Sequence, residues 1–234
     1  MVYCENCQKP LKSLVHSYDG LLTVYYCKAC DRAVCVDEVI GKYHLDRLKE
    51  RLNNTRKVAR IELEPFEFDF FWLGRYTPQR DSILDFKRGK DLKVKEVSVN
   101  VTSFVLILVK AKRIVKPDVI VPVPQSSADA ETPDYRLYGP RFLCSYLSKR
   151  LKIKNGMGYL KRVESLSPAH LSEERPPCER HYQTVKCEDT VRNLHVLLFD
   201  DVYRTGSTVC GCVKRLVEEG VGRVTLITIG NAEL

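Results

Sequence analysis

Short apolar runs alternate with amphipathic stretches in the second half of the chain. Runs at residues 119–124, 195–199 and 224–229 are apolar and bounded by polar or turn residues, which predicts buried strands. Between them, residues 142–151 and 207–219 carry apolar positions at helical spacing. Strands that alternate with helices favour a parallel α/β sheet with helices on both faces.

The middle of the chain is harder to interpret. Apolar and acidic residues alternate over 61–76, which predicts strands, and residues 78–88 form a helical pattern. Residues 97–115 are rich in β-branched residues, yet their apolar positions trace one helical face, and nineteen residues are too long for a typical strand. We therefore expect a helix there. Residues 164–190 are polar and contain prolines, and they predict no element apart from loop.

Residues 42–60 combine helical leucine spacing with a strong positive charge. Leu45, Leu48 and Leu52 predict one or two helices. Seven Lys and Arg residues against two acidic residues give this segment +5 of the chain's net +8. Two interpretations stay open: a solvated helix face, or a surface that contacts nucleic acid or another polyanion.

Composition excludes several classes of protein. The 234 residues are 44% hydrophobic and 29% charged, which is typical of a globular chain. The longest purely apolar run, residues 104–109, is far shorter than a membrane span of about 20 residues. The first residues lack the pattern of a secretory signal. We therefore predict a cytoplasmic protein without membrane contact, whose ten cysteines are not a disulfide framework.

Four of these cysteines form two CxxC pairs separated by nineteen residues: Cys4, Cys7, Cys27 and Cys30. Each pair can occupy two corners of a tetrahedron, so the spacing predicts a structural zinc site of the zinc-ribbon kind. Cys35, His16 and His44 leave the ligand set open, and chance clustering of buried cysteines is the alternative. Cys144 lies on an apolar helical face and predicts core packing. Cys178 and Cys187 carry no interpretation, while Cys210 and Cys212 point in different directions from one helix.

Residues 196–208, VLLFDDVYRTGST, hold the most informative pattern in the chain. A buried strand stops at Asp200 and Asp201, and a turn with Gly206 leads into a helix whose first turn carries three hydroxyls. Ligands of open α/β sheets bind at the carboxyl ends of strands, and a helix N-terminus offers free N–H groups to an anion. The loop therefore predicts a phosphate site, and the carboxylates, which would repel phosphate, suit a ribose diol.

The predicted ligand is thus a ribose 5-phosphate, and two other interpretations compete with it. The aspartates could simply cap the next helix, or the strand could be a metal-binding Walker B strand. No G-x-x-x-x-G-K-[ST] motif accompanies the strand, which argues against a P-loop nucleotide hydrolase. The absence of G-x-G-x-x-G after a strand argues in the same way against a dinucleotide site.

Residues 196–208 resemble the phosphoribosyl pyrophosphate (PRPP) loop of type I phosphoribosyltransferases, and in particular that of the competence protein F (ComF) family, which has a zinc-binding N-terminus. The resemblance covers most of the chain. It extends to the paired CxxC motifs, Tyr76, residues 83–89, the strand and loop at 117–124, Arg162 and residues 171–175.

The resemblance implies a fold, a reaction and a site. Asp200 and Asp201 would be catalytic and hold the ribose hydroxyls, while Mg²⁺ would bridge the pyrophosphate and ribose oxygens. The other residues that would bind PRPP are Arg204, Thr205, Gly206, Ser207 and Thr208 at the 5-phosphate, and Gln125, Ser126 and Ser127 at the pyrophosphate. We expect a zinc module over 1–41, a basic helix and strands that form a hood or linker over 42–75, and a phosphoribosyltransferase-like domain over 76–234. A homodimer is common for this fold.

Two functions remain open at this point. The first is a phosphoribosyltransferase that releases pyrophosphate to an unknown acceptor. The second is a non-catalytic PRPP-binding or nucleotide-binding protein that contacts nucleic acid through residues 42–60, in regulation, DNA uptake or repair. The family's pyrophosphate loop usually carries arginines, whereas residues 125–141 begin with an acidic stretch and offer only Arg136 and Arg141. This departure favours ligand binding over turnover.

Overall fold

The computed structural model describes residues 12–16, 23–27, 32–34, 56–60, 65–110, 112–126, 139–166 and 176–232. Its centre is a six-stranded sheet in the order β4-β5-β11-β10-β6-β7. The six strands are β4 (Arg56–Arg60), β5 (Pro65–Arg75), β6 (Val119–Pro122), β7 (Lys154–Asn155), β10 (His195–Tyr203) and β11 (Arg223–Asn231). Every pair is parallel except β4 with β5. The predicted parallel α/β sheet is therefore confirmed.

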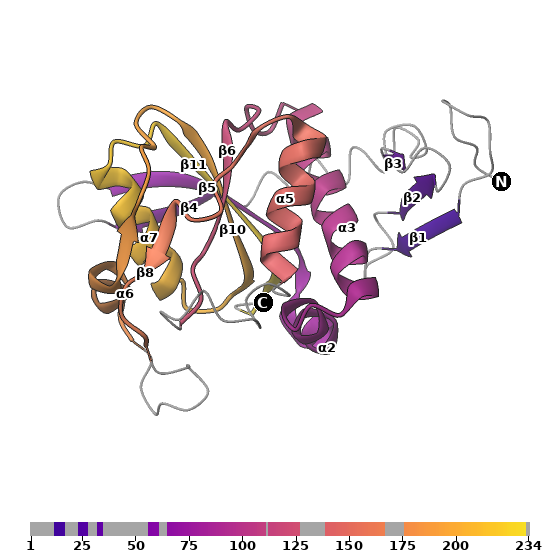
Figure 1. Ribbon diagram of the computed structural model, residues 1–234, viewed down its shortest axis with the longest axis horizontal. Helices are drawn as coiled ribbons and strands as arrows, with labels where there is room; N and C mark the ends of the chain where they lie inside the picture. Colours follow the sequence, from indigo (N-terminus) through magenta and orange to yellow (C-terminus); the bar gives the residue numbers. More distant parts are fainter. Residues whose placement is uncertain are drawn as a thin grey trace.

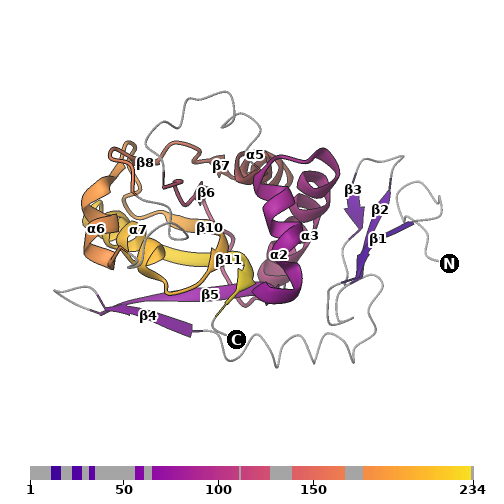
Figure 2. The ribbon, with the colours of Figure 1, turned by 90° about the horizontal axis from the view of Figure 1, so that it is seen from below.

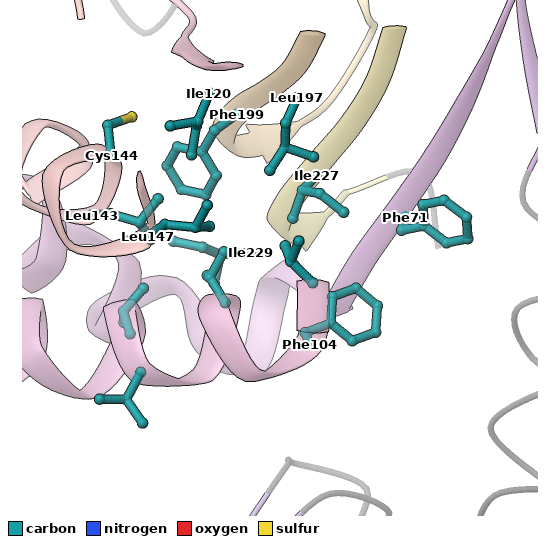
Figure 3. Packing of buried hydrophobic residues seen from close by; sticks show 14 of the residues in the cluster. Phe71, Phe104, Ile120, Leu143, Cys144, Leu147, Leu197, Phe199, Ile227 and Ile229 are labelled. Atoms are coloured by element: carbon teal, nitrogen blue, oxygen red, sulfur yellow. The ribbon is translucent and has the colours of Figure 1, made fainter. Parts of the chain in front are cut away.

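Helices cover both faces of this sheet (Figure 1). One face packs against α2 (Tyr76–Lys87), α3 (Asp91–Lys110) and α5 (Gly139–Leu151), and the other against α7 (Ser207–Glu218), with α6 (Cys178–Thr184) beside it. Side chains of β10 alternate between the two cores: Leu197 and Phe199 contact the α3 and α5 side, shown in Figure 3, while Leu198 contacts the α7 side. The continuous apolar run of β10 is thus explained by burial on both faces.

Two smaller sheets lie outside the main one. The strands β8 (Leu160–Arg162) and β9 (Val185–Cys187) pair antiparallel, as do β1 (Lys12–His16), β2 (Thr23–Cys27) and β3 (Arg32–Val34) in series. The polar stretch 164–190 therefore contains α6 and β9, which hydrophobic periodicity does not reveal. The helix expected over 97–115 is present as α3, which begins earlier and ends at Lys110.

The basic segment differs from its prediction where the structure describes it. Residues 56–60 form strand β4, whereas helical leucine spacing had suggested a helix; residues 42–55 lie outside the described part of the chain. The strand forms because its backbone pairs along β5, with Arg56 opposite Asp69 and Arg60 opposite Pro65. Figure 2 shows both strands at one edge of the molecule. β5, which the sequence placed in a hood or linker, lies within the main sheet beside β11.

Cysteines in the described residues behave in three ways. Cys178 and Cys210 form a disulfide between α6 and α7, with Cα atoms 5.5 Å apart, a pairing that the sequence analysis did not foresee. Cys144 is fully buried, as its apolar helical face predicted. Cys212 is buried and Cys187 is half-buried, and both are free. No helix among the described residues is long and apolar enough to span a membrane.

Candidate functional site

The two aspartates of β10 lie near the carboxyl end of the central strand, where their surroundings differ. The strand continues past them to Tyr203, instead of stopping at the pair as predicted. Asp201 is only 6% exposed, and its Oδ2 lies 2.8 Å from Nζ of Lys87, the last residue of α2. Asp200 is half-buried, and its Oδ1 accepts the backbone N–H of Asp201 at 2.9 Å. Among the residues that the structure describes, Asp201 is therefore paired with a cation, whereas Asp200 forms no ion pair.

The pKa values follow from this arrangement. Burial, and after it the negative charge of Asp201, raises the pKa of Asp200 well above its ordinary value. Burial alone would lower the pKa of Lys87, but the attraction of Asp201 and, more weakly, Asp200 outweighs it, so the pKa of Lys87 is raised. The end of β10 is thus a site of excess negative charge that would accept a further cation or hydroxyl donors.

Beyond the aspartates, the chain turns into α7 through a loop that contains Gly206. Gly206, the N-cap of α7, has φ 75°, and no side chain caps the helix N-terminus. A Cβ at this position would lie 2.7 Å from Cζ of Tyr203, so the backbone conformation and the space both require glycine. Oγ1 of Thr205 lies 3.2 Å from Oγ of Ser207. Thr205 and Ser207 thus lie together where α7 begins, in the same stretch of chain as the first N–H groups of the helix.

Arg204 connects this loop with Tyr76 of α2 through a cation–π contact. Its guanidinium carbon lies 5.0 Å from the centre of the Tyr76 ring, at the start of α2, and the side chain is otherwise exposed. The cation therefore lies beside the loop, and no carboxylate in the described part of the chain forms an ion pair with it.

The second predicted loop begins at the end of β6, the strand next to β10. The N–H of Val123 donates to the carbonyl oxygen of Phe199 at 2.8 Å, so the two strand ends stay together. Past Pro124, the carbonyl oxygen of Gln125 accepts a hydrogen bond from Nε of Arg162, and that of Ser126 accepts the N–H of Leu166 at 2.8 Å. Ser127 lies outside the described residues.

Three side chains at the site carried no role in the sequence prediction. Lys87 follows an apolar helical pattern, Arg162 entered only through the family resemblance, and His181 lies in the polar stretch. Arg162 places a cation behind the Gln125 loop, whereas the sequence suggested that only Arg136 and Arg141 could neutralise pyrophosphate. The long separations along the chain, 37 residues between Arg162 and Gln125, explain why local patterns do not find such contacts.

The predicted zinc ligands lie mostly outside the described residues. Cys27 is the last residue of β2, and its backbone pairs with Arg32 of β3. Cys4, Cys7 and Cys30 are not described. Among described residues there is no group of three metal-binding side chains.

Comparisons with known proteins give a mixed result. No family model matches the chain, and no curated protein matches it. Among solved structures, two crystal forms of a hypoxanthine phosphoribosyltransferase from Staphylococcus aureus match with 16% and 15% identity, a TM-score of 0.31, and coverage of 63% of this chain and 62% of that one. An adenine phosphoribosyltransferase from Saccharomyces cerevisiae matches with 15% identity and a TM-score of 0.35, over 80% of this chain and 90% of that one. The chain thus spans less than two thirds of the length of the bacterial enzyme.

Proposed function

We propose that this chain binds PRPP at the carboxyl ends of β10 and β6, and transfers its phosphoribosyl group to an acceptor with release of pyrophosphate. One observation carries the proposal. Two carboxylates on β10 are followed by a helix N-terminus at Gly206 that no side chain caps. Beside it, the loop of residues 123–126, here called the Gln125 loop, follows β6, the parallel neighbour of β10. A phosphate, a ribose diol and a diphosphate are the three groups that this arrangement suits, and PRPP combines them.

Each part of the ligand has its own set of residues. Asp200 and Asp201 would accept hydrogen bonds from the ribose hydroxyls, because carboxylates only accept. The N–H groups of Ser207 and Thr208, with the hydroxyls of the loop, would bind the 5-phosphate, and the charge of Arg204 would assist them. The Gln125 loop would hold the pyrophosphate, with the Arg162 cation behind it.

The donor set also fits Mg²⁺. Asp200 offers carboxylate oxygens, the ligand type that this hard cation prefers. Burial, and after it the negative charge of Asp201, raises the pKa of Asp200, and a bound cation would offset that charge. When Mg²⁺ is bound together with PRPP, Asp200 would hold it, and the ion would neutralise part of the charge on the leaving pyrophosphate.

The reaction is a displacement at the anomeric carbon. The bond from that carbon to the pyrophosphate oxygen breaks, and pyrophosphate leaves with the electron pair. The acceptor's nucleophilic atom forms a bond to the same carbon and loses its proton to solvent water. The aspartates would stabilise positive charge that develops on the ribose ring, while the two loops hold the ends of the ligand in line. Catalysis would therefore come chiefly from positioning and charge stabilisation.

Calorimetry with PRPP and Mg²⁺ tests the binding step. We expect the wild-type protein to bind, and the double variant Asp200→Asn plus Asp201→Asn to bind at least tenfold more weakly, because two charged acceptors are lost, each worth about 1.5–3 kcal/mol. Asp85→Asn is the matched control, since Asp85 lies on α2 and pairs with Lys90 instead. Equal affinities in all three proteins would contradict the proposal. Pyrophosphate release across a panel of bases and amines then tests turnover and identifies the acceptor.

A non-catalytic protein that contacts nucleic acid is the second candidate. It is favoured by β4, an edge strand in which three of five residues are cationic: Arg56, Lys57 and Arg60. Binding to DNA is measured over a series of salt concentrations. A steep fall of affinity with salt, together with no pyrophosphate release for any acceptor, would favour this candidate; an affinity independent of salt would exclude phosphate contacts.

A further inference from the structure

Arg162 is a buried cation that connects parts of the proposed site. The residue is 5% exposed, and its guanidinium reaches in three directions. Nε donates to the backbone oxygen of Gln125, Nη1 donates to Oγ1 of Thr184 at 2.6 Å, and Nη2 lies 3.4 Å from Nδ1 of His181. Because burying a guanidinium is costly unless its donors are paired, this set of contacts accounts for how the cation is tolerated.

The direction of these hydrogen bonds determines where protons lie. Arginine can only donate, so Nδ1 of His181 accepts, and a neutral His181 ring carries its proton on Nε2. That atom lies 3.4 Å from Oγ1 of Thr208, in the first turn of α7. When Thr208 accepts this hydrogen bond, its own hydroxyl proton is free to point to a different acceptor.

His181 is well suited to stay neutral. The residue is 9% exposed, and burial, followed by the nearby charge of Arg162, lowers the pKa of His181 to about 4. At neutral pH the ring therefore has one donor and one acceptor, as the chain of contacts from Arg162 to Thr208 requires.

We propose that Arg162 and His181 are positioning residues that couple the two ligand-binding loops: Arg162 fixes the Gln125 carbonyl and the His181 tautomer, and His181 turns the Thr208 hydroxyl proton toward the 5-phosphate. This inference rests on the proposed function. It means that a single guanidinium on β8, outside the main sheet, sets the geometry at the ends of both β6 and β10.

The test uses two separate probes, ribose 5-phosphate and magnesium pyrophosphate, titrated calorimetrically into the full chain. His181→Leu should weaken ribose 5-phosphate binding by about 3- to 10-fold, the value of one hydrogen bond, and leave pyrophosphate binding unchanged. Arg162→Met should weaken both. His181→Gln keeps one donor and one acceptor at similar positions, so it should restore most of the affinity lost in His181→Leu.

A double-variant cycle separates positioning from general structural damage. If His181 acts through the Thr208 hydroxyl, His181→Leu should have almost no further effect in a Thr208→Val background. Independent, multiplying effects would overturn the inference. Lys161→Met is the matched control, because Lys161 lies on the same strand β8 with an exposed side chain; it should bind both probes like the wild type.

Nitrogen NMR of the His181 ring gives a readout that does not depend on folding yield or on any ligand. A proton on Nε2 supports the inference, and a proton on Nδ1 overturns it. If the wild type binds PRPP and both probes but the variants bind equally well, the inference alone fails. If the wild type binds none of the three, the proposed function fails, and the coupling inferred here fails with it.

Discussion

At the scale of single residues, the acidic pair shows how far local sequence reasoning reaches. Asp200, Asp201 and the glycine loop are adjacent in the chain, and a buried strand followed by a helix predicts where they lie. Lys87 is more than a hundred positions away, and only the packing of α2 against the main sheet brings it to Asp201. Arg162 and His181 are likewise brought together by tertiary packing, so no spacing rule finds them.

Removal of the Lys87 cation should destabilise the protein. Asp201 is buried, and Lys87→Met would leave its carboxylate without this partner. Because the Lys87 side chain is 43% exposed and solvent screens the pair, we expect the free energy of unfolding to fall by only about 1 kcal/mol. Urea denaturation measures this change.

Lys90→Met is the control for this prediction. Lys90 pairs with Asp85 at 2.7 Å, but both side chains are more exposed than in the Lys87 pair, so the loss should be below about 0.5 kcal/mol. Equal losses in the two variants would mean that burial of Asp201 does not set the strength of its ion pair.

His181 should make stability depend on pH. Its pKa is about 4 in the folded protein and near 6.5 when unfolded, so between these values the unfolded chain binds more protons. The free energy of unfolding should therefore fall as pH decreases from 6.5 to 4, by up to about 3 kcal/mol. His181→Gln should flatten this part of the curve. Some slope should remain, because burial also lowers the pKa of His195; identical curves would contradict the prediction.

At the scale of elements, periodicity predicts the long amphipathic and apolar segments well. The helices α2, α3, α5 and α7 and the strands β6, β10 and β11 occur close to where the apolar pattern places them. The pattern fails for α6 and β9, which are short and mostly polar, and for residues 56–60, where pairing with β5 outweighs helical leucine spacing. Short elements depend on their neighbours more than on their own residues.

The disulfide between α6 and α7 should contribute strongly to stability. Its two cysteines are 32 positions apart in the sequence. A cross-link over this distance restricts the unfolded chain, which should raise the free energy of unfolding by roughly 3–4 kcal/mol. Cys178→Ser should lower the free energy of unfolding by about this amount in oxidising buffer. A reductant should lower the stability of the wild type to the same level and leave the variant unchanged, as followed by thermal unfolding.

Cys187→Ser serves as the control for the disulfide. Cys187 is a free, half-buried cysteine on β9, so its replacement should change stability little and should leave the response to reductant intact. If the oxidised and reduced wild-type proteins unfold at the same temperature, the disulfide does not stabilise the fold.

At the scale of the whole molecule, the proposed PRPP site and the CxxC pairs lie in different parts of the sequence. Every residue of the proposed PRPP site follows residue 76, whereas the four predicted zinc ligands precede residue 31. The sequence predicts both parts, but the joining of β4 and β5 to the main sheet could not be foreseen, because sheet order depends on long-range pairing.

Metal removal should therefore affect one part of the molecule. We expect about one zinc per chain by elemental analysis, and its loss in the double variant Cys4→Ser plus Cys7→Ser. PRPP affinity should stay within about twofold, since no site residue is a zinc ligand. Cys187→Ser should retain the metal. Absence of zinc from the wild type, or its retention in the double variant, would contradict the zinc site.

The two edge strands of the main sheet influence whether copies of the chain aggregate by pairing their sheets edge to edge. An exposed edge strand invites a strand from a neighbouring molecule and so promotes aggregation. Here one border strand, β7, has only two residues, and the other, β4, is cationic at Arg56, Lys57 and Arg60. A short strand gives little to pair with, and like charges repel across an antiparallel edge. The positive charge of β4 therefore disfavours edge-to-edge pairing of two copies of the chain through this strand.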